Sequence, residues 1–423
     1  MDKMENQRKV IIGYDLCDDY SQISLFSYKT FEPISICPNE NQEDDLIPTV
    51  LCIKNDTKLW SYGWEAVNGA SGGNGILVDH LLSKVKSGEE VEIFGQRITG
   101  VALLEKFLRK SLILVKNYFP NEVITKLVIT LREPDPKIIE GVYEALELLG
   151  IEKDRAVVMN HAGAYMYYAL SQDRALWVND VALFDFNEQG LNYYQISVSR
   201  RTNPMIAGME RKEFTDTLSL PMLKQKGLNT SYAFENIANT VLYKQIISTI
   251  YFTGEGFKSG WADEVIKGLC TGRRVFVGQN LYSKGACFAA KELSGDRKLA
   301  DIILLNSEML VSSIWIRVYT DAVTKEIMLT DAAIPWYEVD REIEVIPENI
   351  AELEIILRNI LTKEITRERL HISNLPNRPE RMTRLGIHLC LTERSKAKIT
   401  VTDLGFGEIY PETGQIGEFI IDI

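Results

Sequence analysis

The stretch IIGYDLCDDYSQISLFSY, residues 11–28, decides how the first part of the chain is interpreted. An apolar run stops at Asp15, a short acidic stretch follows, and residues 22–28 then alternate between polar and apolar side chains. The stretch ALFDFNEQGLNYYQISVS, residues 182–199, repeats this order with Asp185 at the end of its apolar run. Each stretch predicts two strands joined by a tight turn. The sequence therefore predicts two similar β-hairpins, each with an aspartate at the end of its first strand.

Helical and strand patterns alternate around the two hairpins, which predicts an α/β fold for the first part of the chain. Residues 101–118 and 137–151 have helical periodicity, and residues 126–133 form an apolar run typical of a buried strand. After residue 300 the pattern changes to short segments of period two separated by turn residues, which predicts a β-sandwich. We expect a first lobe over residues 1–180, a reduced second lobe over 181–298, and a linker with the sandwich over 299–423.

Length and composition narrow the classes of function. A chain of 423 residues is expected to form two or three domains. The net charge of -12 argues against nucleic acid and against an anionic membrane surface as the main partner. No apolar run has the length of a membrane span, and the first ten residues lack the apolar core of a secretory signal. The six cysteines are scattered, which favours free thiols in a reducing cytoplasm.

The two predicted turns suggest a binding chemistry. A turn between strands exposes consecutive backbone N–H groups, and such a nest binds phosphate oxygens. A carboxylate at the strand end can hold a hydrated Mg²⁺ or orient an attacking water. A third stretch, YFTGEGFKSGWADEVI at 251–266, places glycines at a strand-to-helix turn, where backbone can approach a flat ligand closely. Ordinary turn chemistry also explains each stretch taken alone, because aspartate and glycine are common turn residues.

Taken in order, these motifs resemble the actin-like ATPase superfamily, in its DnaK-type heat-shock chaperone branch. The first hairpin resembles the phosphate-1 loop of that family, the hairpin at Asp185 its phosphate-2 loop, and residues 253–257 its adenosine loop. NHAGAYMYYAL (160–170) and NLYSKGACFAA (280–290) are similar to its two connecting helices, and residues 300–316 to its interdomain linker and first sandwich strand. The resemblance implies two duplicated actin-like, ribonuclease H-like lobes, followed by a β-sandwich similar to a chaperone substrate-binding domain.

The resemblance also implies a site. ATP or ADP with Mg²⁺ would bind between the lobes, with Asp15 and Asp185 as catalytic residues that hold the metal directly or through the attacking water. The other residues implied to bind the nucleotide are Cys17, Asp18, Asp19, Gly190, Gly254, Glu255, Gly256, Phe257 and Gly285.

The sequence departs from the family pattern mainly at the positions that would bind the phosphate groups. Cys17, Asp18 and Asp19 stand where the family has glycine and small hydroxylated residues, and carboxylates there repel phosphate unless a divalent ion bridges them. The second turn keeps a single glycine and adds Glu188, and His161 replaces the glutamate of the connecting motif. The pattern selects neither Lys84 nor Lys86 as a catalytic lysine. Retained ATP binding with slow or absent hydrolysis, and complete loss of triphosphate binding, both stay open.

The leading interpretation is a divergent, lidless DnaK-like protein of the cytoplasm that binds a peptide or protein partner through its sandwich. The alternative is an actin-like scaffold or filament subunit. A small-molecule kinase of the same superfamily is disfavoured, because the lobe insertions are short and a sandwich follows the lobes.

Overall fold

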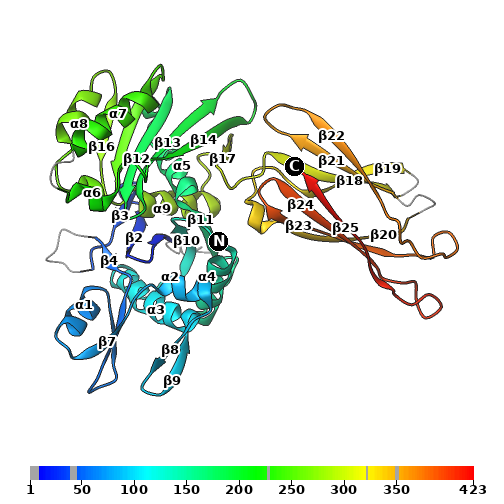
Figure 1. Cartoon of the computed structure of the whole chain (residues 1–423), viewed down its shortest axis with the longest axis horizontal. Helices are drawn as coiled ribbons and strands as arrows, with labels where there is room; N and C mark the ends of the chain where they lie inside the picture. The colour runs from blue at the N-terminus through cyan, green and yellow to red at the C-terminus, as the bar shows by residue number, and fades with distance from the viewer. Residues whose placement is uncertain (1–8, 39–44, 226–228, 321–322, 348–351) are drawn as a thin grey trace, which may run out of the picture. The chain divides into compact units, whose positions relative to one another are not determined.

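The computed structural model describes residues 9–38, 45–225, 229–320, 323–347 and 352–423. The chain divides into two compact units, Met1–Ile302 and Ile303–Ile423. The first unit mixes helices with two large sheets, as the α/β prediction requires, and the second contains two antiparallel sheets (Figure 1). Within the described residues, no helix combines the length and the apolar character needed to cross a membrane.

The first large sheet has the strand order β11-β10-β1-β2-β3. The central strand β1 runs parallel to β10, and β10 runs parallel to β11, whereas β1, β2 and β3 are successively antiparallel. Every residue of β1 is buried, which fits a strand covered on both faces. The bounds are β1 (Val10–Leu16), β2 (Tyr20–Ser27), β3 (Glu32–Ser35), β10 (Ile124–Leu131) and β11 (Ala156–Asn160), with the short β4 (Ile47–Pro48) pairing with β2.

The second large sheet repeats this order and these directions in β16-β15-β12-β13-β14. Both hairpins predicted from the sequence are therefore present. The correspondence extends to single residues, because Asp15 lies opposite Thr130 on the neighbouring parallel strand and Asp185 lies opposite Thr253. The bounds are β12 (Asp180–Asn187), β13 (Gly190–Ser199), β14 (Met205–Glu213), β15 (Ile247–Thr253) and β16 (Arg274–Val277).

Two helices, α5 (His161–Ser171) and α9 (Leu281–Leu293), lie between the two sheets (Figure 1). Small side chains let them pack closely, since a Cβ added to Gly285 of α9 would lie 2.0 Å from the carbonyl oxygen of Ala164 in α5. Ala286, Ala289 and Ala290 of α9 join a buried cluster with residues of the first sheet. Residues 281–293 therefore pack on the first sheet.

The remaining elements of the first unit surround the sheets. Helices α3 and α4 begin at side-chain caps, where Thr99 accepts a hydrogen bond from the N–H of Ala102 and Asp135 accepts one from that of Lys137. The bounds are α1 (Gly63–Ser71), α2 (Leu81–Ser87), α3 (Gly100–Tyr118), α4 (Pro136–Leu148), α6 (Leu220–Leu223), α7 (Thr230–Leu242), α8 (Asp263–Leu269), β5 (Leu51–Lys54), β6 (Trp60–Tyr62), β7 (Gly75–Val78), β8 (Glu90–Ile93) and β9 (Gln96–Thr99).

The second unit confirms the predicted all-β module. Its four-stranded antiparallel sheets have the orders β19-β18-β21-β22 and β20-β23-β24-β25, and their buried apolar faces share one core. The predicted linker at residues 301–305 forms strand β17 (Ile302–Leu305), which belongs to neither of these two sheets. The other bounds are β18 (Ser312–Thr320), β19 (Val323–Thr330), β20 (Asp340–Val345), β21 (Glu352–Asn359), β22 (Ile365–His371), β23 (Leu385–Glu393), β24 (Lys396–Asp403) and β25 (Gly414–Asp422).

Candidate functional site

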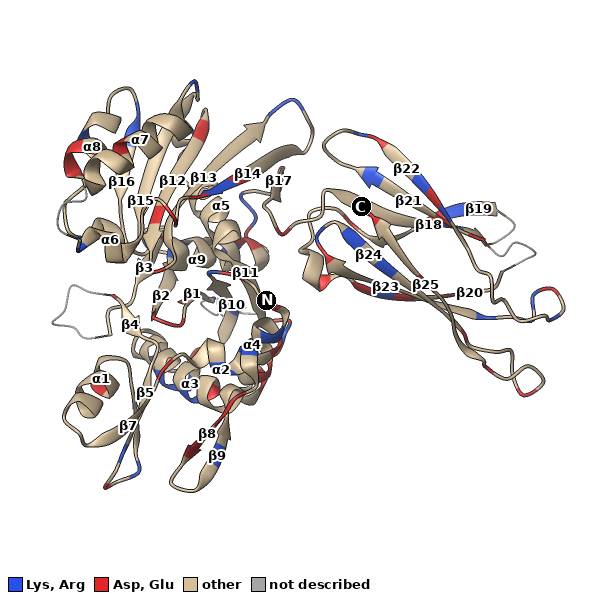
Figure 2. Cartoon of the chain, viewed as in Figure 1, with Lys and Arg blue, Asp and Glu red and all other residues tan. Residues whose placement is uncertain are grey.

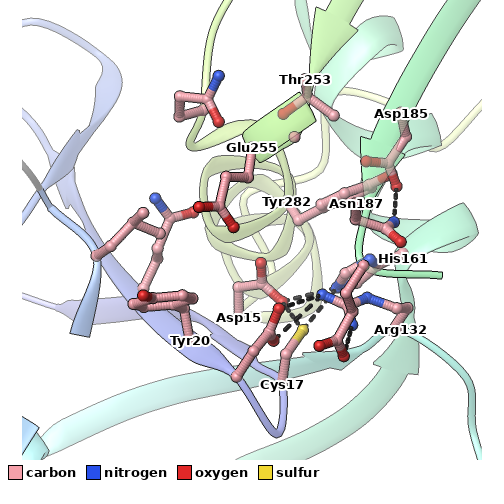
Figure 3. Close-up of a pocket in the computed structure, with 16 residues that line it drawn as sticks. Asp15, Cys17, Tyr20, Arg132, His161, Asp185, Asn187, Thr253, Glu255 and Tyr282 are labelled. Carbon is pink, nitrogen blue, oxygen red and sulfur yellow. Dashed lines mark hydrogen bonds and ion pairs between the residues drawn. The ribbon is translucent and has the colours of Figure 1, made fainter. Parts of the chain in front are cut away.

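The site begins where three neighbouring strands of the first sheet end. Cys17 follows β1, Arg132 follows β10 and His161 follows β11. These strands are parallel, so their carboxyl ends meet at one edge of the sheet, the usual place for a ligand site in an α/β fold. Figure 3 shows the three side chains close together, with Asp15 beside them.

His161 is fixed in place by the way α5 begins. Strand β11 leads directly into α5, and the side-chain oxygen of Asn160 caps the helix by accepting a hydrogen bond from the N–H of Gly163 at 2.8 Å. The imidazole Nε2 lies 2.7 Å from Oδ1 of Asp15, and the ring stacks on that of Tyr282 at 3.7 Å between centroids. His161 therefore connects the first sheet to α9.

Asp185 occupies the corresponding corner of the second sheet. Its Oδ2 accepts hydrogen bonds from the Tyr282 hydroxyl at 2.7 Å and from Nδ2 of Asn187 at 2.9 Å. Burial raises the pKa of the Asp185 carboxyl above its ordinary value, although His161, Tyr282 and Arg132 act in the opposite direction. A continuous chain of contacts, Asp15–His161–Tyr282–Asp185, thus joins the two predicted corners.

A second connection between the hairpins is made by Arg132. Its Nη1 donates to Oε1 of Glu188 at 2.8 Å, and its Nη2 lies 3.2 Å from Oδ2 of Asp19. Burial acts to lower the pKa of Arg132, but the negative groups around it, with Asp19, Asp185 and Glu188 among them, raise it. We call these two ion pairs the Arg132 bridge, because Asp19 belongs to the first turn and Glu188 to the second.

The residues of both hairpins line one pocket, drawn in Figure 3. Its cavity volume is about 70 Å³, against about 300–1,000 Å³ for typical small-molecule sites. The charged lining is mostly acidic, because Arg132 is the single lysine or arginine among the described lining residues. The lining carboxylates are Asp15, Asp19, Asp185, Glu188 and Glu255.

Six of the residues predicted from the sequence meet in this pocket. Asp15 and Asp185 both line it, but each carboxylate already contacts side chains of this chain. Gly254 approaches the second hairpin closely, since a Cβ added there would lie 2.3 Å from the carbonyl oxygen of Phe186. The six are Asp15, Cys17, Asp19, Asp185, Gly254 and Glu255.

The other predicted residues lie outside the pocket lining. Asp18 caps α2, where its carboxylate accepts hydrogen bonds from the N–H groups of Leu82 at 2.7 Å and Ser83 at 3.1 Å. Gly190 begins β13, beside Thr215. Gly256 packs on the ring of Phe186, Phe257 belongs to the buried core of the second sheet, and Gly285 lies at the crossing of α9 with α5.

The two lysines considered from the sequence are also absent from the pocket lining. Lys84 donates to the carbonyl oxygen of Asp79 at 2.9 Å, and Lys86 pairs with Asp135 at 2.9 Å. Arg132 and Tyr282 are two lining residues that the sequence did not predict as part of the site. A signal for Arg132 existed, because it is the first charged residue after an apolar strand and such positions lie at the carboxyl edge of a parallel sheet.

Comparison with known proteins gives two family matches. The sequence model described as "Family of unknown function (DUF5716) C-terminal" matches residues 32–307, more than half of the chain. The chain belongs to the DUF5716 family. A second model, "Domain of unknown function (DUF8552)", matches residues 309–423. The comparison with curated proteins gives no match.

The matched ranges divide the site of this DUF5716 protein. Arg132, His161, Asp185 and Tyr282 fall inside the DUF5716 match, whereas the first hairpin with Asp15 and Cys17 precedes it. The DUF8552 match begins within the second structural unit and runs through all the strands of its two sheets.

Proposed function

We propose that this DUF5716 protein is a divergent DnaK-like binding protein that works without nucleotide. In this proposal the first unit keeps an actin-like ATPase architecture while its cleft has lost triphosphate binding, and the second unit binds a peptide or protein partner. The observation that carries the proposal is the Arg132 bridge, which joins the two turns where a nucleotide phosphate would be gripped.

Repeated topology supports the actin-like part of the proposal. The two large sheets have the same strand order, the same directions and an aspartate–threonine pair at equivalent positions of neighbouring strands. Two helices with small residues at their crossing lie between the sheets. This repetition supports the two duplicated lobes that the resemblance implies.

The residues of the pocket do not fit a magnesium triphosphate. Five carboxylates line it, and its single arginine is already paired with two of them. A triphosphate would bring further negative charge into a partly buried acidic site, which is costly without new counter-charges. Asp185 would also have to give up its hydrogen bonds from Tyr282 and Asn187 in order to hold an ion or its water.

The edge strands of the second unit support a binding role for it. Two edge strands carry many charged residues, which protect a sheet edge against pairing (Figure 2): β20 reads DREIEV and β22 reads ITRERLH. Edge strand β19 instead exposes two consecutive apolar residues, Ile327 and Met328, one toward each face of the sheet. An extended peptide can add to such an edge through main-chain hydrogen bonds and place its apolar side chains against these residues.

The cysteines agree with the proposed cytoplasmic location. None of the six forms a disulfide. Free thiols persist in a reducing compartment, whereas an oxidising one favours disulfides.

The test measures peptide binding to the full chain by fluorescence anisotropy, using labelled heptapeptides rich in apolar residues, with and without Mg-ATP. We expect affinities in the micromolar range, about -8 kcal/mol, that Mg-ATP leaves unchanged. Ile327→Lys on β19 should weaken binding about tenfold or more, because it removes an apolar contact from the proposed edge. The matched control is Ile365→Lys on β22, another exposed isoleucine, which lies on an edge rich in charged residues.

Two results would overturn the proposal. If Mg-ATP shifts the peptide affinity several-fold, the chain has a nucleotide site that is coupled to peptide binding. If both lysine variants weaken binding equally, β19 is not the binding edge.

The Arg132 bridge has its own test. The double variant Asp19→Asn, Glu188→Gln removes both carboxylates that pair with the Arg132 guanidinium. Pyrophosphate should therefore raise the melting temperature of this variant and leave that of the wild type unchanged. Glu133→Gln is the control, because Glu133 pairs with Arg211 and not with Arg132. A wild-type chain that pyrophosphate already stabilises would contradict the proposed role of the bridge.

A further inference from the structure

We propose that Asp15, Cys17 and His161 form a binding site for a divalent transition-metal ion, with Zn²⁺ as the best match. Among the described residues, these three side chains are the group whose metal-ligating atoms converge most closely, all within 4.8 Å of one another. The inference does not depend on the proposed function, because it uses neither the Arg132 bridge nor the sandwich.

The distances between the ligand atoms fit a tetrahedral zinc site. Zinc bonds of about 2.3 Å to sulfur and about 2.0–2.2 Å to nitrogen and oxygen put the ligand atoms about 3.4–3.6 Å apart at tetrahedral angles. Sγ of Cys17 lies 3.6 Å from Oδ1 of Asp15 and 3.7 Å from Nε2 of His161. The third separation, Oδ1 to Nε2, is 2.7 Å and must widen by roughly 0.7 Å to reach the tetrahedral value.

The same geometry argues against a cysteine nucleophile activated by a triad. In a triad the nucleophile contacts one imidazole nitrogen and the carboxylate orients the ring through the other. Here Cys17 and Asp15 both contact Nε2, and Nδ1 is buried without a hydrogen-bond partner among the described residues. Three potential ligands that face one point match a metal site better than a proton relay.

Ligand type selects the class of metal. Thiolate and imidazole favour Zn²⁺ and related transition metals, whereas Mg²⁺ prefers oxygen ligands alone. All three residues are nearly inaccessible, with exposed fractions of 8% for Asp15, 4% for Cys17 and 3% for His161. They come from β1, its turn and the first position of α5, which are rigid elements that hold ligands in register.

The surroundings favour a cation and leave room for a fourth ligand. All three residues border the acidic pocket, so a water there can complete the coordination, as in zinc sites with three protein ligands. When the ion binds, the Cys17 thiol gives its proton to solvent and His161 carries its proton on Nδ1, the nitrogen that no partner occupies.

The test titrates the reduced, chelator-treated full chain with Co²⁺, which substitutes for Zn²⁺ and reports a thiolate ligand through a sulfur-to-metal charge-transfer band. We expect one equivalent to bind with that band, and excess Zn²⁺ to remove it. Cys17→Ser should abolish the band and weaken Zn²⁺ by at least the roughly 10–100-fold that loss of an outer-shell partner causes. Cys270→Ser, at an exposed thiol outside the cluster, should change neither.

Folding of Cys17→Ser is checked by its melting temperature without metal. If that variant fails to fold, X-ray absorption of the zinc-loaded wild type decides, with one sulfur expected at about 2.3 Å among nitrogen and oxygen ligands. A wild type that binds no Co²⁺, a charge-transfer band that survives Cys17→Ser, or a zinc shell without sulfur would each overturn the proposal.

Discussion

At the scale of single residues, Asp185 costs the first unit stability. Its carboxyl is buried and its pKa is raised, so the native state holds its proton more tightly than the unfolded chain does. The contribution is therefore favourable at low pH and is lost as the pH rises through the carboxyl titration, so at pH 7 the ionised group is destabilising. Asp185→Asn removes the charge while its amide oxygen can still accept from Tyr282 and Asn187. We expect it to stabilise the protein by about 0.5–2 kcal/mol at pH 7.

Denaturant unfolding of Asp185→Asn and wild type at pH 7 measures this difference. The gain should shrink as the pH is lowered, because the raised pKa makes the native carboxyl take up its proton before the unfolded one does. Asn187→Ala serves as the comparison, because it removes a hydrogen bond and leaves the charge. A variant less stable than wild type at pH 7 would show that the ionised carboxylate is favourable after all.

Asp403 of the second unit behaves in the opposite way. Burial acts to raise its pKa, but hydrogen bonds from Arg378, Thr413 and Gly405 lower the pKa to about 2. Both partners of the Asp403–Arg378 pair are inaccessible, and the guanidinium donates to the two carboxylate oxygens at 2.9 and 2.7 Å. Because the folded pKa is depressed, this contribution is complete above the unfolded value near 4 and is lost as the pH falls toward 2.

Asp403→Asn should therefore destabilise the second unit by about 2 kcal/mol at pH 7. The deficit should diminish between pH 4 and pH 2, as the wild-type carboxyl takes up its proton. Thermal unfolding across this pH range provides the measurement. A deficit of the same size at every pH would assign the effect to packing rather than to the charge.

Some residues of the site can be predicted from the local sequence, and others cannot. Asp15 and Asp185 were found because each ends an apolar run inside a hairpin pattern. Arg132 and Tyr282 were missed, since their partners Asp19 and Asp185 lie 113 and 97 positions away and only the sheet topology brings them together. The sequence predicts Asp18 in a phosphate loop, whereas in the structure Asp18 caps a helix that begins more than 60 residues later.

At the scale of elements, the packing of α9 on α5 depends on the absence of a side chain at Gly285. An alanine Cβ there would meet the backbone oxygen of Ala164 at 2.0 Å, so the two helices would have to move apart. We expect Gly285→Ala to destabilise the first unit by about 1–3 kcal/mol. Gly268→Ala in α8 is the matched control, since nothing lies within 4 Å of the added atom and alanine is the better helix former.

The two alanine variants should therefore differ in sign. Gly268→Ala should leave the free energy of unfolding unchanged or raise it by up to about 1 kcal/mol. Equal effects in urea unfolding would mean that the helices can separate at little cost.

Secondary-structure elements were predictable from the sequence where one face of the element is buried and the other is exposed, because the side chains then follow a regular polar and apolar pattern. The alternation of polar and apolar residues predicts the strands of the sandwich. The repeated hairpin pattern predicts the hairpins β1–β2 and β12–β13 of the two large sheets. The place of α9 was not predictable from its own residues, because an alanine-rich helix face fits either sheet and only the close approach at Gly285 selects the arrangement.

At the scale of the whole molecule, each of the two units has its own buried core. The buried core of the second unit lies between residues 310 and 421, and the two clusters described for the first unit contain none of these residues. Cores that share no residues unfold cooperatively within themselves, so we expect two thermal transitions by calorimetry rather than one. The variants described above assign the transitions, because each alters one core.

Asp403→Asn should lower the transition of the second unit and leave the other in place, whereas Gly285→Ala should lower that of the first unit. Mg-ATP should move neither transition, since a ligand raises the melting temperature of the unit that binds it, and the proposed function denies this chain a triphosphate site. Zn²⁺ should raise the transition of the first unit alone, because Asp15, Cys17 and His161 all belong to it. A single transition that every variant shifts equally would mean that the two cores unfold as one, and would make the first unit a partner in the stability of the second.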